Sequence, residues 1–462
     1  QIIIEKIIYL NSILAIIVLM TIYALSSGPG IAGISVIRVS GSKTKDVIIN
    51  LTQQEVPEQR VATLRKFNKM SNNELIDEGI LIWFPGPNSY TGEDMAEFHV
   101  HGSKAVVDSI QAMISQIDGC RLADPGEFTK IAFHNGKINL LKAESISDLI
   151  SSETEIQRQQ AIKIMSGKSS EKFNNLRSRL IKILSNVEAK IDFPEDDLPD
   201  DILENIHTET DNIRYEIEKI LNDQRVGEKI REGFKIAIIG PTNAGKSSLL
   251  NYLSRRDIAI VSEIAGTTRD VIEAHLSLDG FPVILSDTAG IRVSKDEIEK
   301  KGIKLALEKA ENADLNIIVI EPKSVDFSDF LNKILIKNSI LVVNKSDLGV
   351  NEISEEIKKY KPIFISVKEE KNLDKLIDLI KESLKNKFIS SEDIYITRER
   401  HRSNLKNCVE HLENFQEKKT IQDFDKGAED LRLAVRYLGM IVGKVDVEEV
   451  LGSIFNDFCI GK

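Results

Sequence analysis

Short apolar runs separated by turns characterise the chain from Met20 to about residue 136. Alternating apolar and polar positions at 34–39, 79–84 and 96–100 predict strands, and turn-forming sequences such as "PGPNS" and "DPGEF" separate them. Between residues 106 and 117, apolar side chains recur at helical spacing instead. This part of the chain is therefore predicted to be a mixed α+β domain.

The pattern becomes helical from residue 137 to 232. Apolar residues recur there every three or four positions, which places them on one helix face: Leu176, Leu180, Ile183, Val187 and Ile191. Residues 388–462 return to helical patterns. Because these two parts flank a segment of a different kind, we expect one all-α helical domain with a second domain inserted into it.

The inserted segment, residues 233–387, alternates helical stretches with continuous apolar runs. The runs "FKIAIIG", "FPVILSD", "LNIIVIE" and "SILVVN" lack the period of two that marks a half-buried strand. Uninterrupted apolar runs are typical of parallel strands covered on both faces. The sequence therefore predicts a doubly wound α/β domain here.

A different apolar run lies at the start of the chain. Ile7–Leu25 is 19 residues without a charge, nearly long enough to span a bilayer. The chain begins with Gln1, however, and Met20 lies inside the run. We expect residues 1–19 to be an upstream extension or a non-native start, and the alternative is a membrane anchor or an uncleaved signal. No comparable apolar run follows Leu25, which argues against a membrane transporter.

Composition narrows the class of protein further. The net charge of −11 argues against a broadly basic surface for nucleic acid, although a local basic patch is compatible with it. Cys120, Cys408 and Cys459 are far apart and odd in number, which excludes a disulfide framework, and no C-x-x-C pair suggests a metal site. A reducing, cytoplasmic compartment fits best.

The segment "GPTNAGKSS", residues 240–248, carries a phosphate-binding motif of the G-x-x-x-x-G-K-[ST] type. It follows a predicted strand and precedes a predicted helix, as the motif requires. Its glycines let backbone N–H groups surround phosphate, and the helix N-terminus adds a positive dipole end. Lys246 is expected to neutralise the β- and γ-phosphates, and Ser247 to offer its hydroxyl to Mg²⁺.

Further nucleotide-binding motifs follow in order. "GTT" supplies Thr268 for Mg²⁺, "DTAG" places Asp287 near the metal and Gly290 at the γ-phosphate, and "NKSD" supplies Asp347 to accept two N–H bonds from guanine. "SVK" is expected to line the base. The predicted GTP-binding residues are Asn243, Ala244, Gly245, Lys246, Ser247, Ser248, Ser262, Thr267, Thr268, Asp287, Thr288, Ala289, Gly290, Asn344, Lys345, Asp347 and Ser366.

The residue after "DTAG" differs from that of many small GTPases. In those proteins a glutamine there orients the attacking water, whereas this chain has Ile291, whose side chain cannot hydrogen-bond. Either hydrolysis is slow or the group that orients water lies elsewhere in the chain.

Longer sequence blocks point to one family. They include "ALSSGPGIAGISVIRVSG", "WFPGPNSYTGEDMAEFHVHG", "DPGEFTKIAFHNGKINLLKAESISDLI", "IDFPEDDLP", "IAIVSEIAGTTRD" and the terminal "GSIFNDFCIGK". Over nearly all of Met20–Lys462 the chain resembles the MnmE/TrmE family of tRNA-modification GTPases. The resemblance implies an N-terminal folate-binding and dimerising domain over 20–136, a helical domain, and a Ras-like G domain inserted in it.

The resemblance also implies a function. A member of this family is a homodimeric, K⁺-dependent GTP hydrolase that works with an FAD-containing partner of the MnmG/GidA type. Together they form the carboxymethylaminomethyl group at C5 of the wobble uridine in certain tRNAs, with 5-formyltetrahydrofolate or a related reduced folate as the one-carbon donor. The alternative is a regulatory or ribosome-assembly GTPase that shares the G domain but carries out no tRNA chemistry.

Folate contacts in the family fall on Arg38, Glu97, Lys137 and Lys462 of this sequence. Cations suit the glutamate tail of a folate, and a carboxylate can accept from pterin N–H groups. Taken alone, these residues are better explained as a strand-face charge at Arg38 and solvated loop charges at Glu97 and Lys137. Cys459 in "FCIGK" is a candidate catalytic residue by the same resemblance, and a small buried hydrophobe is its simpler interpretation.

The resemblance also implies which residues bind the K⁺ ion and which residue orients the attacking water. Backbone and side-chain groups at Asn243, Ser262, Ile264 and Thr267 would bind K⁺, and Glu299 would orient the attacking water in place of the missing glutamine. Without the resemblance, we would interpret Asn243 as a polar turn residue and Glu299 as a charged residue on a helix surface.

Some positions depart from the family pattern. Ile131 replaces an arginine before "AF", Ser103 replaces a glycine, and "SVK" replaces "SAK". A basic patch, "TRERHR" at residues 397–402, is compatible with contact to tRNA phosphate or a protein partner, and equally with a solvated helix face.

Overall fold

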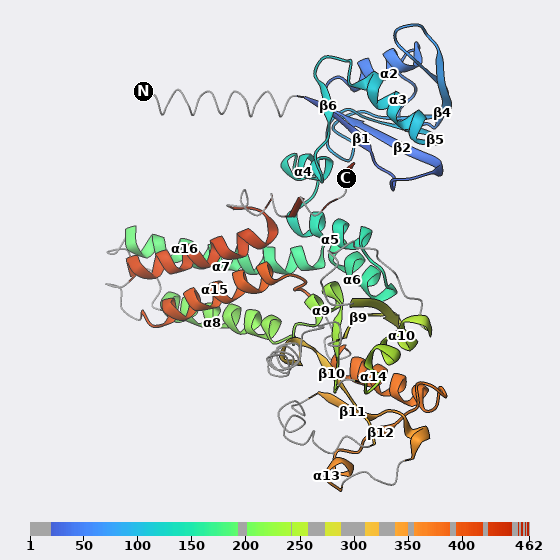
Figure 1. Cartoon of the computed structure of the whole chain (residues 1–462). Helices are drawn as coiled ribbons and strands as arrows, with labels where there is room; N and C mark the ends of the chain where they lie inside the picture. The colour runs from blue at the N-terminus through green and yellow to red at the C-terminus, as the bar shows by residue number, and fades with distance from the viewer. Residues whose placement is uncertain are drawn as a thin grey trace, which may run out of the picture. The chain divides into compact units, whose positions relative to one another are not determined.

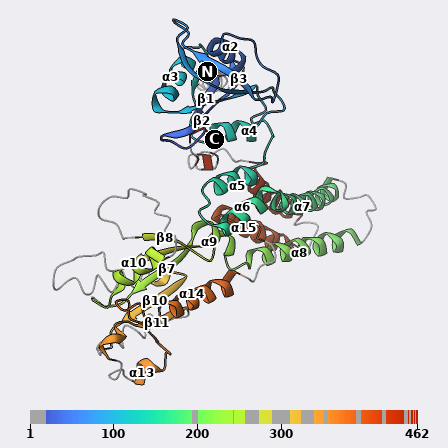
Figure 2. The same ribbon diagram turned by 90° about the vertical axis from the view of Figure 1, so that its right-hand side faces the viewer.

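The computed structural model describes residues 20–192, 201–241, 243–256, 273–287, 310–322, 338–349, 355–388, 394–418, 424–445, 451, 454–455, 458 and 460–461. The chain forms two compact units. The first contains Gln1–Ser147 and Gly439–Lys462, and the second contains Asp148–Leu438. Figures 1 and 2 show the elements of each unit, which are described separately below.

The first unit is built on a six-stranded sheet with strand order β3-β4-β5-β2-β1-β6. Neighbouring strands are antiparallel except β1 and β6, which are parallel. The strands are β1 Thr21–Leu25, β2 Ala32–Ser40, β3 Thr63–Asn68, β4 Leu75–Phe84, β5 Met95–Gly102 and β6 Cys120–Leu122. Helices α2 Thr44–Thr52 and α3 Lys104–Ile114 bury their apolar sides against one sheet face. The α+β prediction is confirmed.

The end of the apolar run Ile7–Leu25 lies inside this sheet. Residues 21–25 form β1, pair with β2 and β6, and are largely buried. Within the ranges given above, the helices are either too short or too polar to cross a bilayer. Residues 1–19 lie outside the described part, so the expectation for them stays a prediction.

Helix α4, Glu127–His134, covers the opposite side of β1. Phe128 and Ile131 pack with Ile22 and Ala24, whose side chains point away from the α2–α3 face. Ile131, the apolar substitute for the family's arginine, thus contributes to a small apolar cluster. A further cluster joins α5, Leu140–Ile150, to C-terminal residues Leu451, Ile454, Phe455 and Phe458.

The second unit contains a group of long helices. They are α6 Glu155–Met165, α7 Lys168–Asp192, α8 Asp201–Leu221, α15 Glu399–Gln416 and most of α16 Phe424–Val442, whose residues from Gly439 on belong to the first unit. Leu176, Leu180, Ile183 and Val187 of α7 are buried, as the helical spacing predicts. Helix α8 packs against both α7 and α15. A helix that precedes the inserted segment, α8, therefore lies beside one that follows it, α15 (Figure 1).

Between α8 and α15 the chain forms a second six-stranded sheet, of order β12-β11-β10-β7-β9-β8. The strands are β7 Phe234–Ile239, β8 Glu273–Leu278, β9 Phe281–Asp287, β10 Leu315–Ile320, β11 Ser339–Val343 and β12 Ile363–Phe364. All neighbouring pairs are parallel except β8 and β9. Separate apolar clusters cover the two faces, one of them formed with α10 Lys246–Arg256 and α14 Leu373–Phe388. The doubly wound prediction is confirmed.

Candidate functional site

The phosphate-binding loop connects β7 to α10. Gly240 has φ +156° and Gly245 has φ +92°, both conformations that L side chains rarely adopt. A Cβ at Gly240 would overlap the Val319 carbonyl oxygen, and one at Gly245 would overlap the Asn344 side-chain amide. Both glycines are therefore needed for the close approach of this loop to its neighbours.

Lys246 and Ser247 directly follow this loop and form the start of α10. Lys246 is buried, and its Nζ lies 2.8 Å from the carbonyl oxygen of Pro241. Ser247 is exposed at the helix N-terminus, where backbone N–H groups and the helix dipole favour an anion. Asn243 is also exposed, with φ +66°. This arrangement suits a bound phosphate group and a cation beside it.

Asn344 connects three loops at the same edge of the sheet. Its buried Nδ2 donates to the carbonyl oxygen of Ala244 at 2.9 Å, and its Oδ1 accepts from the backbone N–H of Val367 at 3.2 Å. The side chain thus joins the "NKSD" loop to the phosphate-binding loop and to the "SVK" loop. The structure brings together residues that lie 100 positions apart in the sequence.

Asp347 presents a carboxylate beside Ser366. The Ser366 hydroxyl donates to Asp347 Oδ1 at 2.7 Å and accepts from the Glu369 N–H at 3.2 Å. The hydrogen bond from Ser366 is the largest cause of a lowered pKa for Asp347, so this group is an ionised acceptor at neutral pH. An ionised carboxylate can accept paired N–H donors from a base edge.

A cavity of about 550 Å³ opens between α10 and the "SVK" loop. Its lining residues are Ser248, Asn251, Tyr252, Arg255, Val367 and Glu370. Two of them, Ser248 and Val367, belong to the motifs predicted to contact nucleotide, and the other four were not predicted from the sequence.

The remaining predicted nucleotide and cation residues lie largely outside the described residues. The backbone of Asp287 ends β9 and lies opposite Ile238 of β7, at the same sheet edge as the phosphate-binding loop. Those outside are Ser262, Ile264, Thr267, Thr268, Thr288, Ala289, Gly290 and Glu299, together with Ile291. Their roles stay predictions.

In the first unit, Arg38 and Glu97 face each other across β2 and β5. Arg38 Nη2 and Nε lie 2.8 and 3.1 Å from Glu97 Oε1. The guanidinium carbon also lies 5.6 Å from the ring centre of Tyr90 and 5.7 Å from that of Phe128, within the range of cation–π contact. The result is a partly buried charged pair next to two aromatic rings.

The loop that carries Tyr90 also meets Lys137. A Cβ built on Gly92 would lie 3.0 Å from Lys137 Cε, so the exposed lysine crosses this loop two residues from Tyr90. Asn135 Nδ2 donates to the Thr91 carbonyl oxygen at 2.7 Å and fixes the approach. Arg38 and Lys137 therefore lie beside one loop, residues 90–93, and Glu97 is joined to it through its pair with Arg38.

Titratable groups in this loop are perturbed by burial. Burial raises the pKa of Tyr90, whose hydroxyl lies 2.8 Å from Thr129 Oγ1. Burial also raises the pKa of Glu93, against the opposing effect of a 2.8 Å hydrogen bond from Ser40. Tyr90, Phe128 and Glu93 were missed from the sequence, although "NSYTGED" and "DPGEF" contain them.

The C-terminal segment returns to the first unit. Gly461 accepts a hydrogen bond from Ser26 Oγ at 2.8 Å, and Ile460 bridges to Pro125. Pro125 lies three residues before Phe128, which contacts Arg38. Cys459 and Lys462 lie outside the described residues, so no position is assigned to their side chains.

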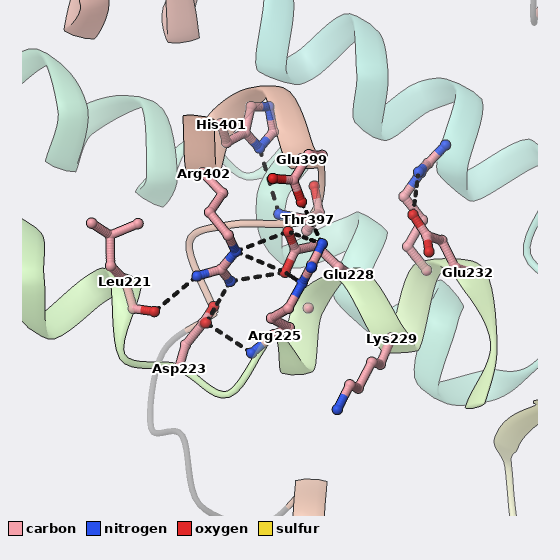
Figure 3. Close-up of polar contacts among 12 residues, drawn as sticks. Leu221, Asp223, Arg225, Glu228, Lys229, Glu232, Thr397, Glu399, His401 and Arg402 are labelled. Carbon is pink, nitrogen blue, oxygen red and sulfur yellow. Dashed lines mark hydrogen bonds and ion pairs between the residues drawn. The ribbon is translucent and has the colours of Figure 1, made fainter. Parts of the chain in front are cut away.

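The basic segment at residues 397–402 serves a structural purpose. Arg402 is buried, with Nε at 3.0 Å from Glu228 Oε1 and Nη2 at 2.6 Å from Asp223 Oδ1 (Figure 3). Its Nη1 donates to the Leu221 carbonyl oxygen at 2.8 Å. Arg398 pairs with Asp148 at 2.7 Å. Arg402 and Arg398 form ion pairs with carboxylates of the same chain. These two residues are therefore neither a solvated helix face nor a surface for tRNA phosphate.

Comparison with known proteins identifies relatives along 96% of the chain. The family model "MnmE helical domain" matches residues 140–459, and "GTP-binding protein TrmE N-terminus" matches residues 21–137. The tRNA modification GTPase MnmE of Pelagibacter ubique (strain HTCC1062) is 70% identical over 443 residues, covering 96% of this chain and 100% of that protein. The MnmE proteins of Rickettsia bellii (strain RML369-C) and Rickettsia rickettsii (strain Sheila Smith) are 44% and 45% identical, with the same coverage. The chain therefore belongs to the MnmE/TrmE family of tRNA modification GTPases.

Proposed function

We propose that this protein hydrolyses GTP in a K⁺-dependent manner and couples hydrolysis to modification of the wobble uridine in certain tRNAs. A flavoprotein partner and a reduced folate complete the reaction, which forms the carboxymethylaminomethyl group at C5. We assign folate binding to residues 20–136, the helical domain to 137–232 and 388–462, and GTP binding to 233–387. We expect the reaction to take place in the cytoplasm.

The observation that carries the folate proposal is the charged pair between aromatic rings in the first unit. A reduced folate has a flat ring with N–H donors and a tail with carboxylates. The carboxylate of Glu97 suits the donors, the cations Arg38 and Lys137 suit the tail, and Tyr90 supplies an aromatic surface. Bound folate would supply the one-carbon unit, and these residues would hold and orient it.

The phosphate-binding loop supports GTP hydrolysis. Lys246 and Ser247 stand at a helix N-terminus suited to phosphate and Mg²⁺, and Asn243 is exposed beside them. Bound Mg²⁺ and K⁺ would offset charge that develops on the phosphates. Because Ile291 cannot orient water, we assign that task to Glu299, whose carboxylate can accept from a bridging water.

A homodimer is consistent with the exposed apolar side chains of the first sheet. Leu64 on β3 and Ile80 on β4 lie directly opposite each other and are 63% and 40% exposed, and Ile34 on β2 is 67% exposed. Exposed apolar patches of this kind mark association surfaces. We assign this surface to the second copy of the chain.

Nucleoside mass spectrometry of tRNA from a strain that lacks this protein tests the proposal. We expect the modified wobble uridine to disappear and to return when the wild-type gene is supplied. Unchanged wobble uridines would favour the alternative, a regulatory or ribosome-assembly GTPase without tRNA chemistry.

The cation dependence has a separate test on the purified protein. We expect GTP hydrolysis to be faster in K⁺ than in Na⁺ at equal ionic strength, and a Glu299→Ala variant to bind GTP but hydrolyse it slowly. Equal rates in the two salts would contradict the K⁺ role, and a wild-type rate in the variant would remove Glu299 from it.

A further inference from the structure

One acidic residue beside the nucleotide motifs belongs to none of them. Glu321 Oε1 lies 2.7 Å from Nζ of Lys345, the lysine of the "NKSD" loop. The side chains of Lys345 and Glu321 are 34% and 28% exposed, so the pair lies at the border of solvent. The other two motif residues of that loop, Asn344 and Asp347, are held by Ala244, Val367 and Ser366, as described above.

The sheet topology fixes this encounter. Strands β10 and β11 are parallel neighbours in which Ile320 pairs with Val343, and the Asn344 N–H donates to the Ile320 carbonyl oxygen at 2.9 Å. Glu321 directly follows β10, and Lys345 follows β11 by one further residue. Both therefore leave the sheet at the same edge, which also carries the phosphate-binding loop.

The loop needs its side-chain contacts because its backbone is unusual. Lys345 has φ +59°, a left-handed conformation that costs energy for a residue other than glycine. Asn344 is held by Ala244 and Val367, the Ser346 N–H donates to the Ile365 carbonyl oxygen at 3.0 Å, and Asp347 accepts from Ser366. Glu321 completes this set by holding Lys345.

The charge of Lys345 is a second reason why the position of this side chain matters for guanine recognition. Lys345 lies two residues from Asp347, whose carboxylate must accept N–H donors if it is to recognise guanine. A flexible lysine ammonium near that carboxylate competes with the base for its oxygens. An ion pair with Glu321 keeps the ammonium at a fixed place and leaves the carboxylate of Asp347 to the base.

We propose that Glu321 is a positioning residue for guanine recognition, which acts by holding the Lys345 ammonium in one place beside the loop that carries Asp347. This inference rests on the proposed binding of GTP at this site. It assigns a role in base selectivity to a residue that lies outside the nucleotide-binding motifs.

The test is a Glu321→Gln variant of the full-length protein, which keeps the shape of the side chain and removes its charge. Because a half-exposed ion pair is weak, we expect the affinity for GDP and GTP to fall about two- to fivefold. The hydrolysis rate at saturating GTP stays at the wild-type value, so the effect appears in KM and not in kcat. Glu321→Asp restores part of the affinity.

Several readouts separate this role from a general loss of structure. Competition by inorganic tripolyphosphate, which has no base, stays unchanged in the variant. Raising the salt concentration brings wild type and variant together, because solvent-exposed pairs are screened. In a double-mutant cycle, Glu321→Gln adds nothing to Lys345→Met, since Glu321 acts through that lysine.

Asp279→Asn is the matched control. Asp279 pairs with Lys381 at 2.8 Å in the turn between β8 and β9, at the opposite edge of the same sheet, and the substitution changes the net charge equally. It leaves GTP affinity unchanged. Wild-type affinity in Glu321→Gln, or equal weakening of tripolyphosphate, overturns the inference. If the wild-type protein itself binds no GTP, the proposed function fails instead.

Discussion

Two arginines show how the same side chain can use all of its hydrogen-bond donors in one region and leave part of them unused in another. Arg402 lies where the chain enters and leaves the inserted domain, and each of its guanidinium nitrogens donates to a carboxylate or carbonyl oxygen (Figure 3). Arg38 instead directs two nitrogens at one oxygen, Glu97 Oε1, and lies near two aromatic rings. The first arginine is saturated by the protein, and the second retains capacity for a ligand.

The surroundings of Arg402 extend the contrast. Glu228 belongs to α9, Val226–Glu232, the helix directly before β7 and the phosphate-binding loop. Arg225 also pairs with Glu228, at 3.3 Å, and with Glu399. The two points at which the chain passes between helices and inserted sheet are therefore held together by charged side chains, which are buried at Arg402 and Glu228 and exposed at Arg225 and Glu399. We call this set, Asp223, Arg225, Glu228, Glu399 and Arg402, the junction cluster.

The largest expected effect comes from Arg402→Met. The substitution leaves Glu228 buried without its main partner, and breaking a buried pair in this way costs about 3–5 kcal/mol. Unfolding followed by urea titration and circular dichroism measures the loss. The control is Arg432→Met, since Arg432 is a half-exposed arginine paired with Glu188 at 3.0 Å, and we expect it to cost at most about 1 kcal/mol. Equal, small losses in both variants would contradict the structural role of Arg402.

The next effect comes from backbone packing beside the junction cluster. Gly227 lies so close to the chain after the inserted domain that an added Cβ would overlap the Ile396 carbonyl oxygen. Because backbone must shift to make room, we expect Gly227→Ala to cost about 1–3 kcal/mol in the same unfolding experiment. Gly33→Ala is the control, since a Cβ there meets nothing within 4 Å. A neutral Gly227→Ala would mean that this crossing is loosely packed.

Arg38→Met tests the other half of the comparison. We expect a smaller loss of stability than in Arg402→Met, about 1–3 kcal/mol, because the Glu97 side chain is 18% exposed whereas that of Glu228 is 3% exposed. The affinity for 5-formyltetrahydrofolate, measured by titration calorimetry, falls about tenfold, as the loss of a charge-assisted hydrogen bond implies. Lys69→Met, which removes another cation–carboxylate pair of the same sheet, leaves folate affinity unchanged. Wild-type folate affinity in Arg38→Met would remove it from the site.

The sequence predicted the elements better than the contacts between them. Continuous apolar runs predicted strands β7, β9, β10 and β11 of the inserted sheet but not its edge strands β8 and β12. Gly240, Gly245 and Lys246 were found by a motif whose parts are adjacent. The edge strands β3 and β6 were missed, because β6 has only three residues and β3 is half exposed. Short or exposed strands carry little hydrophobic pattern.

The junction cluster was missed for another reason. Arg402 and Glu228 lie 174 positions apart, and no local pattern distinguishes a buried arginine from a solvated one. The pairing of Arg38 with Glu97 likewise depends on the register of β2 against β5, although the family resemblance named both residues. Such contacts depend on chain connectivity and strand register, and neither can be predicted from the local pattern of a single sequence.

The smallest expected effect is a difference in acid stability. Burial alone would raise the pKa of Glu228, but hydrogen bonds and charges from Arg402 and Arg225 outweigh it, and the pKa is lowered. A lowered pKa contributes stability that is present above the ordinary glutamate value of about 4.3 and is lost as pH falls through the folded-state pKa. Replacing the pair by apolar residues, with Arg402→Met and Glu228→Leu together, removes this contribution.

We therefore expect the double variant to lose less stability than wild type between about pH 5 and pH 2, because wild type alone must protonate a paired Glu228. Urea midpoints measured across this range give the two slopes, and their difference reports the loss of Glu228 together with the loss of the Arg402–Asp223 pair, because both proteins share the other carboxylates. Arg402→Lys keeps a cation beside Glu228 and retains more of the wild-type slope. If the double variant loses stability in acid as steeply as wild type, the charge on Glu228 does not stabilise the junction cluster, and the contrast with Arg38 reduces to packing alone.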